Sequence, residues 1–451
     1  MQRAQISADR YKQFIPLSLP DRSWPDQRLS AAPRWLSTDL RDGNQSLAVP
    51  MDPERKLAMF ELLVRMGYKE IEVGFPVASR DDHAFVRMLI EQERIPEDVW
   101  ITVLVPAKDE AIRQSMQSLR GAPRATFHLY NATAPVFRQV VFKMSRDECK
   151  DMAVRGTHVM MKFAERTLAD CDLRFQYSPE VFNETEPDFA VEVCESVMDA
   201  WEPGPGREMI LNFPTTVERS QPHVFADQIE WLDRNLRRGE HVCLSIHPHN
   251  DRGTGVAATE LGLLAGAERV EGCLFGNGER AGNVCLVTLG MNLLTAGIDP
   301  GIDFSDIDEV RQVAEHCTGM PVHARHPYAG DLVYTAFSGS HQDAIKKGMD
   351  ALSREAGEAG VPEGDLPWRV PYLPLDPNDV GRSYEAMVRI NSQSGKGGVA
   401  YVMSAHHGVD VPVADRREFA DVIQSMADAE GGEITSDRIA AAFTSMYRET
   451  P

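Results

Sequence analysis

Residues 242–255 read VCLSIHPHNDRGTG and join a short apolar run to a dense group of polar side chains. The run has the length of a buried strand, and His247 and His249 stand at its end. Histidines two positions apart on a strand point to the same face. Because a core disfavours paired imidazoles and a surface loop rarely needs them, the stretch indicates a functional site at the end of a strand.

Seven similar runs lie between residues 34 and 278, and segments with helical apolar spacing separate them. The runs are RWLSTDLRD (34–42), YKEIEVGFP (68–76), VWITVLVP (99–106), RATFHLYN (124–131), RFQYSPE (174–180), MILNFPTT (209–216) and RVEGCLFGNG (269–278). The helical segments include ERKLAMFELLVRMG (54–67) and TGVAATELGLLAGA (254–267). Eight strand–helix units over about 250 residues predict an α/β fold, the (β/α)8 TIM barrel. A doubly wound open sheet is the alternative, but no GxGxxG follows the first predicted strand.

The rest of the chain predicts small, mainly helical C-terminal subdomains after the barrel. We expect an N-terminal arm over 1–30, the barrel over 31–325, a linker subdomain over 326–390 and a small helical subdomain over 391–451. We expect the last barrel helix in SDIDEVRQVAEHC (305–317) and a loop in the acidic segment 350–368. A helix and a turn are expected over 379–395. Two amphipathic helices around a Gly-Gly break are expected over 415–449.

The composition is that of a soluble globular protein, with 43% hydrophobic and 25% charged residues among 451. The formal net charge of −21 disfavours nucleic-acid binding, which needs a basic surface. No apolar run approaches the roughly 18–20 residues that cross a bilayer, and the N-terminus lacks a signal-peptide core. Seven scattered cysteines without a CxxC pair favour reduced thiols. We therefore expect a cytoplasmic protein that binds neither nucleic acid nor membrane.

In a TIM barrel the chemistry lies at the carboxyl ends of the strands, and strands 7, 8 and 1 are neighbours after closure. Asp42, at the end of the first predicted strand, and Asn283, after the eighth, can therefore approach His247 and His249. One carboxylate, two imidazoles and an amide oxygen form a mixed set of ligands that suits Zn²⁺, Mn²⁺, Co²⁺ or Mg²⁺. A metal with open positions can chelate a 2-oxo acid and stabilise the alkoxide that forms on attack.

Other predicted strand ends are polar in the same way. These residues are Arg41, His128, Tyr130, Ser178, Glu180, Thr216, Asn277 and Glu279. Contact with solvent explains two or three polar strand ends, but hardly the whole set. Arg41 can add positive charge at the oxygens of a substrate, or it can form an ion pair that only orients Asp42.

Two groups of motifs carry a resemblance to a known family. In the barrel they are STDLRDGNQSL, HLYNAT, YSPE, SIHPHNDRGTG and EGCLFGNGERAGNVCLVTLGMNL. Beyond it they are RHPYAGDLVYTAFSGSHQDAIKKG and VPYLPLDPNDVGRSYEAMVRINSQSGKGGVAY. From about residue 30 to its end, the chain resembles the 2-isopropylmalate synthases of actinobacterial type, which are metal-dependent, Claisen-condensing barrel enzymes.

The resemblance implies an acyltransferase that condenses acetyl-CoA with 2-oxoisovalerate to give 2-isopropylmalate and CoA, the committed step of leucine synthesis. It implies a divalent cation (Mg²⁺, Mn²⁺ or Zn²⁺) on Asp42, His247 and His249, with Asn283 in the same motif. The implied contacts of the 2-oxo acid are Arg41, Leu104, His128, Tyr130, Ser178 and Thr216. The implied polar residues near acetyl-CoA are Glu180 and Glu279. His341 and Tyr372 match residues that a partner subunit places over the active site, which implies a homodimer.

For catalysis we expect Arg41, Glu180, Glu279, His341 and Tyr372 to act near the reacting groups, with His341 or a water that it activates as the base. Without the resemblance, His341 would be read as a helix-capping or interfacial histidine. Glu279 has a second reading too, because it can brace Arg280 or Arg41 instead of taking part in the chemistry.

Other functions stay open at this point. One is a condensing enzyme that uses another 2-oxo acid, as in homocitrate-type or specialised metabolism, and another is a metal-dependent acyl-CoA lyase. The GNGERAGN motif and the C-terminal subdomains argue against the lyase. Members of the family commonly carry a C-terminal leucine-binding domain, and this chain ends at Pro451, where that domain would begin. Leucine feedback by that route is therefore not expected.

Overall fold

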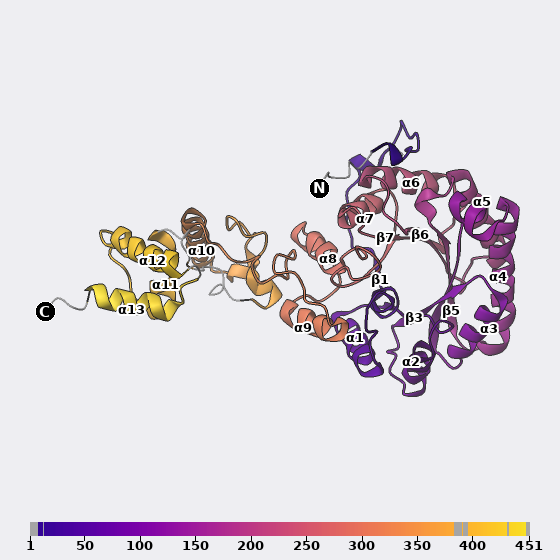
Figure 1. Ribbon diagram of the computed structural model, residues 1–451, viewed down its shortest axis with the longest axis horizontal. Helices are drawn as coiled ribbons and strands as arrows, with labels where there is room; N and C mark the ends of the chain where they lie inside the picture. Colours follow the sequence, from indigo (N-terminus) through magenta and orange to yellow (C-terminus); the bar gives the residue numbers. More distant parts are fainter. Residues whose placement is uncertain (1–7, 12, 383–389, 391–395, 431–432, 448–451) are drawn as a thin grey trace, which may run out of the picture. The chain divides into compact units, whose positions relative to one another are not determined.

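The computed structural model describes residues 8–11, 13–382, 390, 396–430 and 433–447. The chain divides into two compact units. The first comprises Met1–Asp303 and Gln312–Met320, and the second comprises Phe304–Arg311 and Pro321–Pro451. Figure 1 colours both units along the chain, from indigo at the N-terminus to yellow at the C-terminus.

The first unit is built on eight parallel strands that close into a barrel in the order β1 to β8. The strands are β1 (Arg34–Ser37), β2 (Glu70–Gly74), β3 (Trp100–Pro106), β4 (Arg124–Ala132), β5 (Asp172–Glu180), β6 (Met209–Thr215), β7 (Val242–Pro248) and β8 (Arg269–Gly272). β1 pairs with β2 on one side and with β8 on the other, which closes the sheet. The predicted TIM barrel is confirmed, with its helices around the strands (Figure 1).

Helices follow the strands in alternation. They are α1 (Pro53–Met66), α2 (Arg80–Glu91), α3 (Asp109–Ser118), α4 (Arg146–Thr167), α5 (Pro187–Trp201), α6 (Pro222–Asn235), α7 (Gly255–Leu264), α8 (Leu286–Thr295) and α9 (Ile307–Thr318). Short helical turns are η1 (Ala8–Arg10), η2 (Trp24–Asp26), η3 (Asp39–Gly43), η4 (Phe137–Phe142) and η5 (Phe182–Glu184). The predicted helices over 54–67, 254–267 and 305–317 correspond to α1, α7 and α9. None of the helices in the described part of the chain could span a membrane.

Local signals explain where these helices begin and end. The Asp52 side chain caps α1 by accepting a hydrogen bond from the backbone N–H of Arg55 at 2.9 Å. Gly67 ends the same helix with a φ of 104°, in the left-handed region that favours glycine. Ser145 and Glu148 form a capping box at the start of α4.

The first strand is shorter than the sequence pattern predicts. It ends at Ser37 rather than at residue 42, because Asp39–Gly43 form the π-type turn η3. Within this turn, the Gly43 N–H donates to the Thr38 carbonyl at 3.1 Å. Asp39 stabilises the turn by accepting hydrogen bonds from the Ser37 hydroxyl at 2.8 Å and from the backbone N–H of Leu274. Turns of this type are frequent at functional sites, and this one carries Arg41 and Asp42.

The last strand is also shorter than predicted. β8 ends at Gly272 rather than at residue 278, and the chain then folds back so that Cys273 pairs with Cys285 in an isolated bridge. The run looked continuous in sequence because its apolar residues extend to Phe275. The glycines that follow allow the chain to turn, and no periodicity of apolar residues shows where the turn begins.

The N-terminal arm is anchored on α6. Trp24 is buried, and its indole N–H donates to the Asp227 carboxylate at 2.8 Å. The backbone N–H groups of Ser23 and Trp24 donate to the Glu230 carboxylate at 2.8 and 3.1 Å. These bonds satisfy two buried carboxylates of one helix with donors from a segment about 200 positions earlier in the chain.

The second unit is mainly helical, as predicted. Its helices are α10 (Gly339–Ala359), α11 (Lys396–His407), α12 (Arg416–Glu430) and α13 (Ser436–Tyr447), with short turns η6 (Glu363–Asp365) and η7 (Pro377–Val380). Val399, Met403, Phe419 and Ile423 form part of the core that α11, α12 and α13 share. The two predicted amphipathic helices correspond to α12 and α13, whereas α11 was not predicted.

One segment of the second unit corrects the sequence analysis. Residues 350–359 belong to α10 and are not part of a loop. Leu352 and Ala356, four positions apart, are buried on one face of the helix, which ends at Gly360 with a φ of 69°. The acidic residues Asp350, Glu355 and Glu358 are exposed, and this polar content made the segment look like a loop. The predicted helix and turn over 379–395 lie mostly outside the described residues, and the predicted subdomain boundaries stay predictions.

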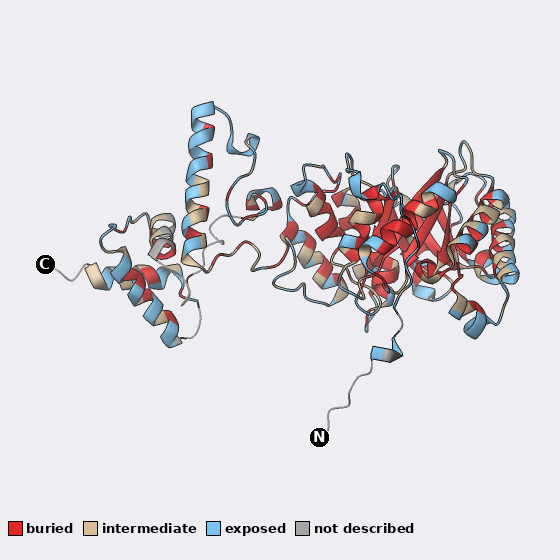
Figure 2. Cartoon of the chain, turned by 90° about the horizontal axis from the view of Figure 1, so that it is seen from above, coloured by how far each residue is buried: buried red, intermediate tan, exposed pale blue. Residues whose placement is uncertain are grey.

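Charged side chains occupy the barrel interior at the N-terminal side of the strands. Figure 2 shows the strands buried almost throughout. Arg269 is fully buried, and its Nε donates to Glu70 at 2.7 Å while its Nη1 donates to Glu271 at 2.5 Å. Buried charges of this kind require partners, because an isolated buried charge is strongly unfavourable.

We expect Arg269→Met to lower the barrel's free energy of unfolding by about 3–5 kcal/mol, because Glu70 and Glu271 lose their shared cation. The control is Lys69→Met, since the Lys69–Asp98 pair is more than half exposed on both sides (56% and 64%) and is worth less than about 1 kcal/mol. Urea unfolding followed by circular dichroism measures both changes. Equal losses in the two variants would contradict the role of the interior ion pairs.

Candidate metal centre and active site

Three side chains converge at the carboxyl ends of β1 and β7. One ligand atom each of Asp42, His247 and His249 lies within 4.8 Å of the others, and all three residues are buried. Asp42 Oδ2 is 3.5 Å from His247 Nε2 and 3.6 Å from His249 Nε2. The two imidazoles lie nearly parallel, with ring centroids 5.3 Å apart and planes 7° apart. Both histidines therefore face the same side, as their spacing predicted.

Asn283 completes this group from the loop after β8. Its Oδ1 lies 2.7 Å from His247 Nε2, while its Nδ2 donates to the Asn277 carbonyl at 2.8 Å. The loop has room for this amide only because residue 278 is a glycine, since a Cβ there would lie 2.2 Å from Asn283 Nδ2. Gly278 has a φ of 154°, which other residues rarely adopt.

The chemistry of these atoms fits a bound cation. Asp42 Oδ2 and His249 Nδ1 are buried and have no hydrogen-bond partner among the described residues. His247 Nε2 faces two oxygen acceptors, those of Asp42 and Asn283, so a proton or a metal ion is needed between them. Carboxylate, imidazole and amide-oxygen ligands together suit a divalent metal.

The pKa values at this centre reflect its burial and its charges. Burial opposes ionisation of Asp42, but the neighbouring Arg41 and His247 hold the pKa of its carboxyl well below the usual range. Burial likewise opposes the charged form of His247, yet hydrogen bonds to Asp42 and Glu271 raise its pKa to about 10. Burial and the neighbouring His247 lower the pKa of His249 to about 4. A proton and a cation therefore compete for the same space beside His247.

A cavity of about 230 Å³ opens beside the three candidate ligands. Its lining includes every predicted barrel residue of the substrate and catalytic sets. They are Arg41, Leu104, His128, Tyr130, Ser178, Glu180, Thr216 and Glu279. Five further lining residues had no predicted site role: Gln45, Phe75, Asn212, Pro214 and Arg280.

Arg41 is held by two carboxylates at the cavity wall. Its Nε is 2.5 Å from Glu72 and its Nη1 is 3.0 Å from Asp42, and the Arg41 side chain is only 10% exposed. The second carboxylate oxygen of Glu72 lies 2.7 Å from His128 Nδ1. The ion pair with Asp42 is therefore present, and Arg41 also lines the cavity, so both predicted readings of this residue are compatible with the structure.

His128 and Ser178 form a second polar contact at the cavity. His128 Nε2 is 2.7 Å from Ser178 Oγ, which also accepts a hydrogen bond from Asn212 Nδ2 at 2.9 Å. Burial raises the pKa of the nearby Glu180 carboxyl, although Arg41 opposes this shift. The cavity thus combines the guanidinium of Arg41 with a carboxyl group, that of Glu180, whose pKa is higher than usual.

The remaining predicted residues of the cavity wall are of two kinds: some give apolar or aromatic surface, and others form hydrogen bonds at the rim. Leu104 is 8% exposed, and the Tyr130 ring packs edge-on against Phe75 with centroids 6.4 Å apart. The Thr216 hydroxyl accepts a hydrogen bond from the Val181 N–H at 2.9 Å, so it ties two neighbouring loops together. Glu279 contacts Gln45 Nε2 at 3.4 Å at the rim of the cavity.

His341 and Tyr372 belong to the second unit and do not line the barrel cavity. Their rings stack with centroids 3.9 Å apart and an angle of 18° between the planes. Tyr372 is 60% exposed and has a φ of 67°. The structure thus places the Tyr372 ring against His341, in a backbone conformation that residues other than glycine rarely adopt.

Sequence reasoning missed several buried polar residues below the cavity. They are Glu72, Gln176, Ser245 and Glu271, all fully buried on strands. A signal was available for two of them, because Gln176 lies two positions before Ser178 and Ser245 lies two positions before His247. Residues at that spacing share the interior face of the barrel.

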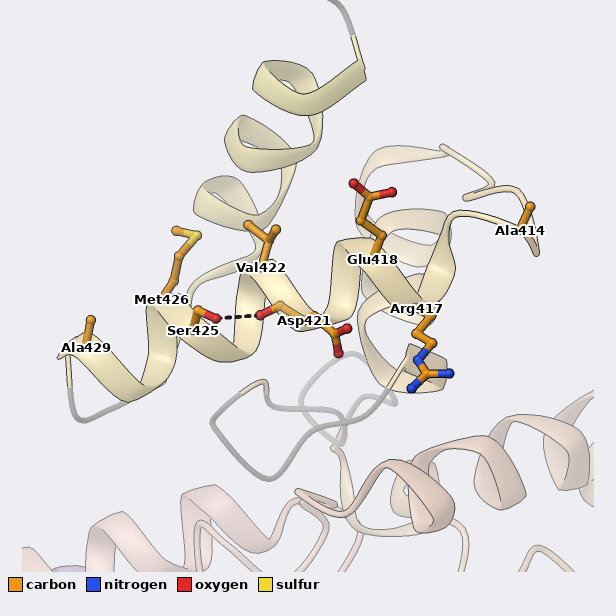
Figure 3. A pocket seen from close by; sticks show the side chains of 8 residues that line it. All are labelled: Ala414, Arg417, Glu418, Asp421, Val422, Ser425, Met426 and Ala429. Atoms are coloured by element: carbon orange, nitrogen blue, oxygen red, sulfur yellow. Dashed lines mark hydrogen bonds between the residues drawn. The ribbon is translucent and has the colours of Figure 1, made fainter.

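A second, more open hollow of about 780 Å³ runs along α12 in the second unit. Figure 3 shows its lining on α12 and on the loop before it, which carries Ala414. The Ser425 hydroxyl donates to the Asp421 backbone oxygen at 2.8 Å. Among the described residues this hollow gathers no set of metal-ligating side chains comparable to that of the barrel cavity. We therefore place the candidate active site in the barrel.

We expect Asp42→Asn to weaken Mn²⁺ binding by more than about 100-fold, since loss of an outer partner alone costs about 10- to 100-fold. The electron paramagnetic resonance signal of free Mn²⁺ measures the affinity. Asp227→Asn is the control, because Asp227 is also buried but lies on α6, where it bonds to the Trp24 indole instead of facing the centre. Retained affinity in the Asp42 variant, or an equal loss in the control, would contradict this assignment.

Comparisons with known proteins identify the family to which the chain belongs. A family model described as HMGL-like matches residues 32–314, and a model described as alpha-isopropylmalate synthase, post-catalytic domain-like, matches residues 331–404. The solved structure of hydroxymethylglutaryl-CoA lyase from Pseudomonas aeruginosa is similar with a TM-score of 0.54 over 65% of this chain and 96% of that one. At 19% identity this likeness shows the barrel fold alone.

Curated relatives cover nearly the whole chain. The 2-isopropylmalate synthase of Streptosporangium roseum is 73% identical over 97% of this chain and 76% of its own length. That of Thermobifida fusca is 63% identical over 97% of this chain and 77% of its own length. This chain belongs to the 2-isopropylmalate synthase family of HMGL-like barrel enzymes.

Proposed function

We propose that the protein condenses acetyl-CoA with 2-oxoisovalerate and water to give 2-isopropylmalate and CoA, the first committed step of leucine synthesis. The observation that carries this proposal is the group of Asp42, His247 and His249 beside Arg41 in one cavity. The names of the relatives support the reaction, because 2-isopropylmalate is the product that they specify.

The cavity suits a small branched 2-oxo acid. Its volume of about 230 Å³ holds a molecule of this size, with Leu104, Phe75 and Pro214 as apolar surface for the isopropyl group. Arg41 supplies the positive charge that a carboxylate or a developing alkoxide needs. His128, Tyr130, Ser178 and Thr216 provide polar groups that orient the acid.

A divalent cation, Mg²⁺, Mn²⁺ or Zn²⁺, is proposed on Asp42, His247 and His249, with Asn283 as a further oxygen ligand. When bound, it supplies Lewis-acid polarisation of the keto group of the 2-oxo acid. The buried Asp42 Oδ2, which has no hydrogen-bond partner among the described residues and lies 3.6 Å from His249 Nε2, supports a cation at this place. The mixed ligand set is compatible with each of the three metals.

The reaction proceeds in two stages. The methyl carbon of acetyl-CoA loses a proton and forms a bond to the keto carbon, whose oxygen takes up a proton. Water then cleaves the thioester, so that the C–S bond breaks and CoA leaves as its thiol. The thioester methyl group is weakly acidic, and the base must therefore be held close to it.

His341, or a water that it activates, is proposed as that base, together with Tyr372 and Glu180. The stacked His341–Tyr372 pair, with its exposed Tyr372 ring, supports a role in contact with a ligand. We propose that the second unit of one copy supplies this pair to the barrel of another copy, in a homodimer. Glu279, at the rim of the cavity beside Gln45, is proposed to act on the acetyl-CoA side or to brace Arg280.

We place this enzyme in the cytoplasm and assign it no nucleic-acid partner. The net charge of −21 supports the second statement, because a polyanion would be repelled. Buried thiols such as Cys149, Cys194 and Cys243 support a reducing compartment.

We expect thiol release from acetyl-CoA to require 2-oxoisovalerate and a divalent metal. The assay incubates the protein with acetyl-CoA, metal and a panel of 2-oxo acids and follows CoA with a thiol reagent. 2-Oxobutyrate should react about 10- to 200-fold less efficiently, because its missing methyl group costs about 1–3 kcal/mol of binding, and pyruvate, which lacks two carbons, should be a poorer substrate still. Preference for another 2-oxo acid favours the sister condensing enzymes, and release from none of them contradicts condensation. Cleavage of 3-hydroxyacyl-CoA thioesters into acetyl-CoA and a carbonyl compound would favour a lyase.

We expect His341→Ala to reduce kcat by about 100-fold or more, in line with the loss of a general base, while binding of the 2-oxo acid stays within about two-fold. Steady-state kinetics and isothermal titration measure the two quantities. His323→Ala is the matched control, because His323 is an exposed histidine of the same unit. Unchanged turnover in the His341 variant removes this residue from the mechanism.

A further inference from the structure

Below the cavity floor, the fully buried Glu271 reaches a candidate metal ligand without lining the cavity itself. It lies on β8, and its carboxylate extends toward β7 inside the barrel. Glu271 Oε2 is 3.0 Å from His247 Nδ1. The carboxylate thus forms a hydrogen bond with the ring nitrogen of His247 that faces away from Asp42.

The partners of Glu271 determine which atom carries the hydrogen in this contact. Its Oε1 accepts hydrogen bonds from Arg269 Nη1 at 2.5 Å, Gln176 Nε2 at 2.6 Å and Ser245 Oγ at 3.2 Å. The fully buried guanidinium of Arg269 forms an ion pair with this oxygen, and such a contact is that of an ionised carboxylate. An ionised carboxylate can only accept, so the hydrogen lies on His247 Nδ1.

The other nitrogen of the same ring is then available to a cation. His247 Nε2 lies 2.7 Å from Asn283 Oδ1 and 3.5 Å from Asp42 Oδ2. Asn283 presents its oxygen there because its Nδ2 donates to the Asn277 carbonyl. With a hydrogen on Nδ1, the neutral ring directs a lone pair from Nε2 to the place where these oxygens converge.

We propose that Glu271 is a positioning residue that holds His247 in the Nδ1–H form and thereby sets the affinity of the centre for its divalent cation. Carboxylates that orient metal-bound histidines in this way raise the basicity of the ligand and fix the ring. The inference rests on the proposed metal role of His247. It assigns a function to a residue that contacts neither the substrate cavity nor the cation.

The change of Glu271 to Gln reverses this hydrogen bond while it keeps the shape of the side chain. Arg269, Gln176 and Ser245 are all donors, so they hold the oxygen of the new amide on their side. The NH₂ group then faces His247 Nδ1 and donates to it. The ring hydrogen moves to Nε2, where it blocks the metal.

We expect Glu271→Gln to weaken Mn²⁺ binding by about 10- to 100-fold in the full-length, metal-stripped protein. The measurement is a titration of the free Mn²⁺ resonance signal, with no substrate present. Glu70→Gln is the matched control, since Glu70 is a buried interior carboxylate that bonds to Nε of the same Arg269 but to none of the candidate ligands. Its Mn²⁺ affinity should change less than about three-fold.

A third variant, His247→Ala, separates this inference from the metal site itself. Loss of Mn²⁺ binding in His247→Ala with wild-type affinity in Glu271→Gln overturns the role of Glu271 and leaves the site intact. Unchanged affinity in both variants overturns the site. Equal losses in the Glu271 and Glu70 variants reduce Glu271 to a structural residue.

A measurement on the unmodified chain covers the case in which Glu271→Gln does not fold. Nitrogen-15 NMR of histidine-labelled protein separates the two neutral tautomers and the imidazolium by the shifts of the ring nitrogens, and the missing signal in His247→Ala assigns the residue. With bound Zn²⁺, the expected His247 spectrum has a protonated Nδ1 and a metal-bound Nε2. A metal-bound Nδ1, or a protonated Nε2, contradicts the proposal.

Discussion

Pairing between β8 and β1 is the constraint on which the whole site depends. Asp42 follows β1 and the two histidines end β7, so some 200 residues separate them in sequence. Only closure of the sheet brings their ligand atoms within 4.8 Å. The turn η3 and the glycine-containing loop after β8 then aim Asp42 and Asn283 at the same point. The fold therefore assembles a centre that no local segment could form.

Paired charges in the barrel interior offset the unfavourable electrostatic energy of burying this centre. A cluster of buried acceptors beside Asp42 is unfavourable without a cation, and the layer beneath it is correspondingly rich in paired charges. Glu72 connects Arg41 with His128, and Glu271 connects Arg269 with His247. Each carboxylate thus joins an arginine to a histidine whose ring reaches the cavity. Such fixed polar groups cost little reorganisation when charge develops during a reaction.

Much of the fold and of the site could be predicted from sequence. Eight apolar runs with intervening amphipathic helices specify the barrel, and polar strand ends identify Asp42, His128, Ser178 and His247. The boundaries of β1 and β8 could not be predicted, because tertiary hydrogen bonds of Asp39 end one strand and a glycine-containing loop ends the other. Buried Glu72 and Glu271 escaped notice because a charged residue inside an apolar run is usually read as solvent-facing. Their partners come from other strands, which no local pattern reveals.

The central claim is that one divalent cation lies between β7, β8 and β1. Anomalous diffraction from crystals grown with Mn²⁺ or Zn²⁺ tests it most directly, because the peak locates the ion independently of any assay. The account predicts a single strong peak within about 2.0–2.3 Å of Asp42, His247 and His249, at distances typical of oxygen and nitrogen ligands. A peak elsewhere in the barrel, or none at these side chains at saturating metal, would contradict it.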